Sequence, residues 1–255
     1  MLLKAADISY YDRMRSAAIF ADYVHEELGL RMSAPVEMGA CNGEKLAYAL
    51  YGWVEGFDAD LVIPKLHTPL QVRCGEEAGR LLRKIHSVKP PKDVFDSYPQ
   101  RIKKAVERFK VCAVNFKGDK ETVEFLERNA DITACRPVCA VHGDFTTGSL
   151  VVDKSGGLGI IDFDGWDWGD PVRDFARVRF SCTKAFVKGQ LRGYLGENIP
   201  TDFFKLMAYY TAADVISEID RAYLSGGERL VRALKYGEEA ARSYSGYGGT
   251  IPSWY

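Results

Sequence analysis

The N-terminal part of the chain has the residue pattern of one helix followed by a β-hairpin. Within residues 10–28 apolar side chains recur at helical spacing, and Gly29 is typical of the residue that ends a helix. The segments Pro35–Gly39 and Leu46–Val54 have the pattern of strands around Asn42-Gly43, a strong hairpin signal. The apolar face of the helix comprises Ala17, Ala18, Phe20, Ala21 and Val24.

Helical periodicity dominates the rest of the chain, with one strand-rich block in its middle. That block runs from Pro137 to Phe163, and the glycine-rich residues 244–249 near the C-terminus are expected to fray. Helices are predicted at about 71–87, 98–110, 120–130 and 203–224. The simplest division is therefore a small α+β segment, residues 1–56, followed by a larger and mainly helical segment, residues 57–255.

Composition and charge exclude several classes of protein. The 255 residues include 34 Lys+Arg and 35 Asp+Glu, a net charge of −1, so no polybasic nucleic-acid-binding surface is indicated. No apolar run approaches the roughly 20 residues that span a bilayer, and the first residues lack the pattern of a signal peptide. The six cysteines form no complete zinc-binding spacing and are expected to be reduced thiols. We therefore expect a cytoplasmic protein without nucleic-acid or membrane partners; nothing in the pattern specifies an oligomeric state.

The most informative segment is a predicted hairpin in the strand-rich block. Two short apolar strands, Leu150–Asp153 and Leu158–Ile161, flank a glycine-containing loop. With the turn centred in that loop, Ser149 would lie opposite Asp162 at the open end of the ladder. The loop that carries Asp144 would emerge at the same end. Three oxygen-bearing side chains are therefore expected to converge there.

The two carboxylates at this position suit two chemical roles. Asp162, at the end of a buried apolar strand, would supply hard oxygen ligands to Mg²⁺. Asp144, in a glycine-bracketed loop, would accept a proton from a substrate hydroxyl. The alternative is that both carboxylates only cap turns, but the second aspartate and the hairpin spacing favour the chemical role.

The motifs of this segment occur in an order found in a known family. They are His142-Gly143-Asp144, then Ser149 five residues after that aspartate, then Ile161-Asp162-Phe163 and Gly169-Asp170-Pro171. This combination resembles the aminoglycoside phosphotransferase/choline kinase-like family, whose members are relatives of the protein kinases. The resemblance implies an α+β, protein-kinase-like two-lobe fold. A small, incomplete N-terminal lobe with the hinge would occupy residues 1–56, and a larger, mainly helical C-terminal lobe residues 57–255.

The resemblance also implies site roles and cofactors. Asp144 would be the catalytic base that orients the acceptor hydroxyl, and Asp162 together with Ser149 would bind Mg²⁺. Lys4 would contact the phosphates of ATP or GTP. The nucleotide base would be bound by the backbone of a connector that comprises Tyr51, Gly52, Trp53 and Val54.

Three features depart from the family pattern. Ser149 stands where the family has a metal-binding asparagine, and a serine hydroxyl is a shorter and weaker ligand for Mg²⁺. The strand that holds Lys4 is the first in the chain, so the family's phosphate-covering hairpin has no counterpart here. We therefore expect either an N-terminus upstream of Met1 or a shortened paralogue. The next helix presents residues 17–19 where a glutamate would pair with Lys4, which predicts a poorly positioned lysine.

Two main interpretations of function follow. In the first, the protein is a small-molecule kinase that uses Mg-ATP to phosphorylate a hydroxyl of a small acceptor. Asp164, Asp167 and Asp174 would suit a cationic aminoglycoside or amino alcohol, or would instead cap loops and pair with Arg173 and Arg177. In the second, it is a catalytically impaired pseudokinase or truncated paralogue that binds a nucleotide or a partner. A metal-dependent hydrolase is a third, less favoured because few histidines are present.

Overall fold

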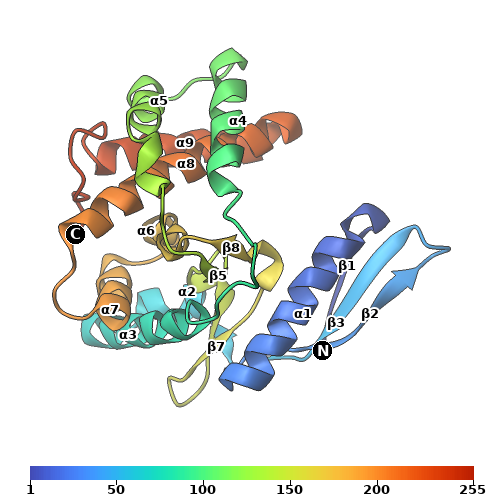
Figure 1. The fold of residues 1–255 in the computed structure, drawn as a ribbon. Helices are drawn as coiled ribbons and strands as arrows, with labels where there is room; N and C mark the ends of the chain where they lie inside the picture. Colours follow the sequence, from blue (N-terminus) through green and yellow to red (C-terminus); the bar gives the residue numbers. More distant parts are fainter. The chain divides into compact units, whose positions relative to one another are not determined.

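In the computed structural model, which describes residues 1–255, the chain is divided between two units that each combine segments distant in sequence (Figure 1). The first unit consists of Met1–Val88, Ala140–Asp167 and Ser181–Gly196. The second consists of Lys89–Cys139, Trp168–Phe180 and Glu197–Tyr255. Gly56 lies within the first unit, and the lobe boundary expected there stays a prediction.

The first unit begins with a three-stranded antiparallel sheet of order β1-β3-β2 and one long helix (Figure 1). These elements are β1 (Leu2–Asp7), α1 (Tyr11–Leu28), β2 (Pro35–Cys41) and β3 (Leu46–Tyr51). Helix α1 packs on β2 and β3, its buried residues are those that the periodicity predicted, and Gly29 follows it with a left-handed φ of 58°. Strand β1 pairs along its length with β3, so that Lys4 lies opposite Ala49.

A second antiparallel sheet, of order β4-β6-β7, contains the hairpin that the sequence singled out. Its strands are β4 (Phe57–Asp58), β6 (Leu150–Val152) and β7 (Leu158–Ile160). Leu150 pairs with Ile160 and not with Ile161, so the predicted register is wrong by one residue. Ile161 lies beside Ser149 instead, with its N–H donating to the Ser149 carbonyl at 2.9 Å. Asp162 therefore follows beyond the ladder and does not face Ser149.

The loop of this hairpin accounts for the shift. The Asp153 carboxylate accepts hydrogen bonds from the backbone N–H groups of Ser155 and Gly157, at 2.8 and 2.9 Å. Gly156 adopts a left-handed φ of 87°, and the Asp153 N–H donates to the Gly157 carbonyl. These contacts favour a three-residue loop whose last residue is left-handed over the even turn expected from the sequence.

Two helices of the first unit pack with their backbones in close contact (Figure 1). Besides α1, the helices of this unit are α2 (Ala59–Val62), α3 (Thr68–Ile85) and α7 (Lys184–Leu195). A Cβ atom at Gly75 of α3 would lie 2.0 Å from the Phe186 carbonyl oxygen of α7. One at Gly189 of α7 would lie 2.1 Å from the Val72 carbonyl oxygen of α3. Only glycine permits this approach of the two backbones.

The second unit is built from helices that pack around α8. Its helices are α4 (Tyr98–Val111), α5 (Asp119–Arg128), α8 (Thr201–Ser225) and α9 (Gly227–Ser243). The short elements β5 (Cys139–Val141), β8 (Asp167–Gly169) and α6 (Val178–Ser181) each include residues of both units. Helices α4, α5 and α9 contact α8, which buries side chains on most of its circumference. None of the helices is both long and apolar enough to cross a membrane.

The C-terminal residues, expected to fray, belong to the core of this unit. Tyr244, Tyr247 and Trp254 are only 2%, 6% and 6% exposed. The Tyr247 ring stacks on Phe125 of α5, with ring centroids 4.9 Å apart. Large aromatic rings gain enough from burial to outweigh the flexibility of the neighbouring glycines. The expectation of a frayed tail is therefore wrong.

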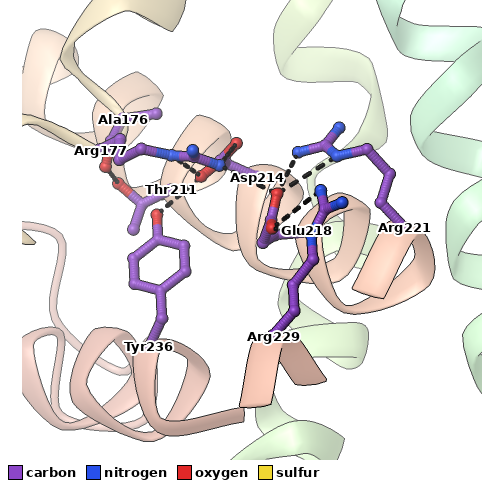
Figure 2. A network of polar contacts seen from close by, with 8 residues as sticks. All are labelled: Ala176, Arg177, Thr211, Asp214, Glu218, Arg221, Arg229 and Tyr236. Atoms are coloured by element: carbon purple, nitrogen blue, oxygen red, sulfur yellow. Dashed lines mark hydrogen bonds and ion pairs between the residues drawn. The ribbon is translucent and has the colours of Figure 1, made fainter. Parts of the chain in front are cut away.

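A network of ion pairs ties α8 to α9 and to the segment that precedes α6 (Figure 2). Glu218 of α8 accepts hydrogen bonds from Arg221 at 2.7 Å and from Arg229 at 3.4 Å. One turn earlier, Asp214 accepts from Arg177 at 2.9 Å. Burial raises the pKa of Glu218, but the arginine hydrogen bonds and charges outweigh it, so that the pKa is lowered.

Candidate active site

The residues predicted to bind the nucleotide line one cavity of about 160 Å³ in the first unit. Lys4 of β1 and Tyr51 of β3 form part of its wall, and Gly52, Trp53 and Val54 of the connector form another part. Asp162, the predicted metal ligand beyond β7, lines the same cavity. The remaining lining residues, which were not predicted from the sequence, are Leu2, Ala21, Ser33, Gly56, Asp58, Val151, Ile161 and Phe163.

The connector is fixed by hydrogen bonds to the residues that precede β2. The Gly52 N–H donates to the Ala34 carbonyl at 2.8 Å, and the Ser33 hydroxyl donates to the Gly52 carbonyl at 2.8 Å. Both backbone groups of Gly52 are thus engaged within the protein. The Trp53 side chain is 61% exposed, whereas Tyr51 is buried.

Lys4 is held between two carboxylates. Its Nζ lies 2.7 Å from Asp162 Oδ1 and 2.7 Å from Asp164 Oδ2, and 5.6 Å from the centre of the Tyr51 ring. Burial lowers the pKa of Lys4, but the hydrogen bonds to Asp162 and Asp164 outweigh it and raise the pKa. The expectation that Lys4 lacks a positioning partner is therefore wrong, because the partners come from the loop after β7 and not from α1.

The electrostatics of Asp162 mirror those of Lys4. Burial raises the pKa of Asp162, but the hydrogen bond and charge of Lys4 outweigh it and lower the pKa. The residue also adopts a left-handed backbone conformation, with φ of 66° and ψ of 69°, which is strained for a residue other than glycine. The site therefore holds an ionised carboxylate in a backbone conformation that costs energy.

Helix α1 contacts the loop after β7 at two places. Arg13 donates hydrogen bonds from Nε and Nη2 to the Asp164 carbonyl, at 3.3 and 3.1 Å. The Phe20 ring stacks on Trp166 with centroids 4.1 Å apart and an interplanar angle of 8°. Arg13 was not among the predicted site residues, although its position in line with the apolar stripe of α1 is a usable signal.

The loop that carries Asp144 is anchored through the residues before it. Gly143 has φ of 87°, and a Cβ atom there would lie 1.9 Å from the Gly165 carbonyl oxygen. His142 is fully buried, with Nε2 3.2 Å from the Ile161 carbonyl oxygen, and its Nδ1 accepts the Asp144 N–H at 3.4 Å. These partners require the proton on Nε2. The Asp144 side chain itself is exposed.

Ser149 contacts this loop directly. The residue is only 4% exposed, and its hydroxyl donates to the Asp144 carbonyl at 2.6 Å. Its N–H donates to the Thr146 carbonyl. Ser149 therefore braces the loop that presents Asp144, and its assignment as a metal ligand stays a prediction.

The oxygen donors of the site fit Mg²⁺ as a pair of carboxylates. Asp162 and Asp164 already converge on one cation, the ammonium of Lys4. Hard oxygen donors in this number suit Mg²⁺, which keeps several waters when it is held by one or two carboxylates. No group of three or more His, Cys, Asp or Glu side chains is arranged to hold a metal ion without water.

In the second unit, Asp170 of the Gly-Asp-Pro motif is a buried structural residue. It is fully buried and caps the following turn by accepting the Val172 N–H at 2.9 Å. Arg136 donates to it at 2.6 Å and the Tyr210 hydroxyl at 3.2 Å. Asp170 therefore organises its own unit.

Comparisons with known proteins identify the family of the chain. Over residues 1–209 the chain matches the model of the phosphotransferase enzyme family. A search of curated proteins gave no match.

Several solved structures have a similar fold. A thermostable mutant of aminoglycoside phosphotransferase APH(4)-Ia shows 16% identity and a TM-score of 0.67, over 96% of this chain and 87% of that one. A mutant of aminoglycoside 2'-phosphotransferase IIIa in complex with GDP shows 13% identity and a TM-score of 0.68, over 92% and 84%. Aminoglycoside phosphotransferase APH(3'')-Id from Streptomyces rimosus, in complex with ADP and streptomycin, shows 17% identity and a TM-score of 0.60, over 84% of this chain and 86% of that one. These matches confirm the predicted α+β, protein-kinase-like fold.

Proposed function

The chain belongs to the phosphotransferase enzyme family, and from this premise we propose that it transfers the γ-phosphate of ATP or GTP to a hydroxyl group of a small molecule. The observation that carries the proposal is the single cavity lined by Lys4, by the connector Tyr51–Val54 and by Asp162. These residues come from three separate parts of the chain. Their convergence supplies the parts of a nucleotide site: a base-binding backbone, a phosphate-binding cation and a metal-binding carboxylate.

The base of the nucleotide is assigned to the connector. Because Gly52 uses both of its backbone groups within the protein, hydrogen bonds to the base fall to the backbone of Trp53 and Val54. Apolar side chains that include Leu2 and Val151 line the same cavity and suit the faces of a planar ring.

The phosphates are assigned to the other side of the cavity, at Lys4. Asp162 and Asp164 are the residues that would hold Mg²⁺, which supplies charge neutralisation to the phosphate oxygens when bound. Lys4 now pairs with these two carboxylates, so its ammonium has to exchange them for phosphate oxygens when the nucleotide binds. Its raised pKa keeps the ammonium charged for both partners.

Asp144 is assigned the acceptor hydroxyl. The Asp144 side chain is exposed, while its backbone is fixed by His142 and Ser149. A carboxylate presented in this way can orient a hydroxyl and accept its proton as the phosphoryl group is transferred. We propose a cationic acceptor, an aminoglycoside or an amino alcohol, on the strength of the similar structure that contains streptomycin.

A second function, nucleotide or partner binding without transfer, is favoured by one observation. The Ser149 hydroxyl donates to the Asp144 carbonyl, whereas the family pattern has an asparagine amide for the metal at this position. Asp162 and Asp164 would then be left to hold Mg²⁺ without a third side-chain ligand. The chain would bind nucleotide weakly and act as a pseudokinase.

Transfer assays distinguish the two functions. Purified protein is incubated with γ-labelled ATP or GTP, Mg²⁺ and a panel of aminoglycosides and amino alcohols. We expect labelled product with at least one acceptor, and a loss of turnover of about 100-fold or more in Asp144→Asn with nucleotide affinity retained. The exposed Asp131→Asn serves as the matched control. Nucleotide binding without transfer to any acceptor would favour the pseudokinase, and full turnover by Asp144→Asn would remove the catalytic assignment.

A further inference from the structure

The first unit contains a second and larger cavity, of about 700 Å³, which we name the hairpin–α3 cavity. It is bounded by the β6–β7 loop on one side and by β4, α2 and the start of α3 on the other. Its volume falls within the range of roughly 300–1,000 Å³ that is typical of small-molecule sites. It shares no lining residue with the nucleotide cavity, so the inference does not depend on the proposed function.

Large apolar side chains of the hairpin–α3 cavity are open to solvent. Phe57 at the edge of the β4-β6-β7 sheet is 56% exposed, and Leu70 in the first turn of α3 is 42% exposed. Val62 and Leu66, which lie between these two residues in the sequence, line the same cavity. Large apolar side chains gathered in a concave surface mark binding sites more often than isolated exposed ones do.

The acidic residues that line the cavity are all neutralised by arginines. Glu77 pairs with Arg80 at 2.9 Å, and Asp153 pairs with Arg31 at 3.1 Å. The third carboxylate is Glu76, whose partner is Arg192 of α7. None of these carboxylates is therefore left to attract a cationic ligand.

Two basic residues of the lining have no acidic partner. They are Arg73 of α3 and Lys154 of the β6–β7 loop, and both are exposed. The lining thus combines apolar side chains with two cations that come from different elements. Arg73 can bind a carboxylate through two parallel hydrogen bonds, and Lys154 can add a second charge-assisted bond.

We propose that the hairpin–α3 cavity binds an amphipathic organic anion, a carboxylate with an aliphatic or aromatic body. The carboxylate contacts Arg73 and Lys154, and the body covers Phe57 and Leu70. Charge complementarity selects this ligand over the cationic acceptors considered for the nucleotide site. Contact with a second copy of this same surface is also disfavoured, because it would bring the unpaired cations Arg73 and Lys154 of the two copies together.

Calorimetric titration with decanoate tests the proposal on the full chain. We expect one decanoate per chain, with affinity that falls as ionic strength rises. Acetate, which has the head without the body, and decyltrimethylammonium, which has the body with the opposite charge, should each bind at least about tenfold more weakly. Arg73→Glu and Lys154→Glu should each reduce the affinity for decanoate at least about tenfold, consistent with loss of a charge-assisted bond.

Matched variants separate the cavity from general charge effects. Arg83→Glu makes the same change on an exposed residue of α3 that does not line the cavity, and Lys45→Glu does so in the loop between β2 and β3. Both should bind decanoate within about twofold of the unmodified protein. If Arg73→Glu fails to fold, the milder change Arg73→Gln takes its place and should likewise weaken the binding of decanoate.

Three results would overturn the proposal. One is the absence of decanoate binding at millimolar concentration. Another is binding without the proposed charge dependence, shown by equal affinity for decyltrimethylammonium or by Arg73 and Lys154 variants that bind decanoate unchanged. The third is a dimer in sedimentation velocity that Leu70→Asp dissociates while decanoate has no effect, which would assign the surface to self-association.

Discussion

The ammonium of Lys4 lies 2.7 Å from a carboxylate oxygen of Asp162, although 158 positions separate the two residues in the chain. The contact brings the first strand of the protein to the end of the β6–β7 hairpin. The raised pKa of Lys4 and the lowered pKa of Asp162 keep both groups charged at neutral pH. The proposed phosphate end of the cavity is thus organised by opposite charges before any nucleotide is present.

Gly143→Ala should destabilise the protein by about 3 kcal/mol or more, because its Cβ would lie 1.9 Å from the Gly165 carbonyl oxygen. Gly156→Ala is a close control, since Gly156 has the same φ of 87° but no atom within 4 Å of the added Cβ. It should cost about 1 kcal/mol from backbone strain alone. Chemical denaturation measures both, and equal losses would show that the two loops separate easily.

Ser149→Ala should lose the brace on the Asp144 loop. Removing the hydroxyl leaves the Asp144 carbonyl without this donor, at a cost of about 1 kcal/mol in the free energy of unfolding. Ser16→Ala, on the exposed side of α1, should change it by less than about 0.5 kcal/mol. Denaturant titration checks the difference. If Ser149→Ala is as stable as the unmodified protein, the hydroxyl does not brace the loop.

Arg13→Met should release the loop after β7 from α1. The variant keeps the length of the side chain but removes both hydrogen bonds to the Asp164 carbonyl. We expect faster hydrogen–deuterium exchange in residues 163–166 than in the unmodified protein. Arg15→Met, an exposed change two residues further along the same helix, should leave that exchange unchanged. Identical exchange in both variants would show that the Arg13 hydrogen bonds do not hold the loop after β7.

Glu218→Gln should remove a pH-dependent part of the stability. The arginines lower the folded-state pKa of Glu218 below its ordinary value of 4.5, so its contribution is present above that pH and is lost as pH falls through the lowered pKa. At pH 7 we expect the variant to be about 2 kcal/mol less stable, since the arginines lose a charged acceptor.

The difference between the unmodified protein and Glu218→Gln should therefore shrink as the pH falls below about 4.5. The control is Glu239→Gln, at an exposed position of α9. Its stability should differ only slightly from that of the unmodified protein, both at pH 7 and below about pH 4.5. Thermal unfolding across this pH range gives the comparison, and a gap that stays constant with pH would argue against the network in Figure 2 as the cause.

Local pattern was sufficient to predict the elements that position the site. The apolar stripe of α1 and its end at Gly29 follow directly from helical periodicity and from the left-handed residue that glycine permits. The motif residues of the strand-rich block likewise fall where a strand, a loop and a hairpin were expected. Backbone geometry sets such features, and it is encoded by neighbouring residues.

Features set by side-chain contacts were not predictable in this way. The hairpin register differs by one residue from the predicted one because Asp153 accepts hydrogen bonds from two backbone N–H groups within its own loop. The partners of Lys4 come from a segment that is distant in sequence, and periodicity carries no information about them. Tyr247 sits among glycines and still packs on Phe125, since ring burial depends on a surface formed elsewhere.

Calorimetric titration with a non-hydrolysable ATP analogue, with and without Mg²⁺, tests the nucleotide site most directly. We predict binding that Mg²⁺ strengthens and that Lys4→Met weakens at least about tenfold, since the ammonium is assigned to the phosphates. The exposed Lys45→Met should bind like the unmodified protein. No binding at millimolar analogue, or binding that neither Mg²⁺ nor Lys4→Met alters, would contradict the assignment of this cavity to a nucleotide.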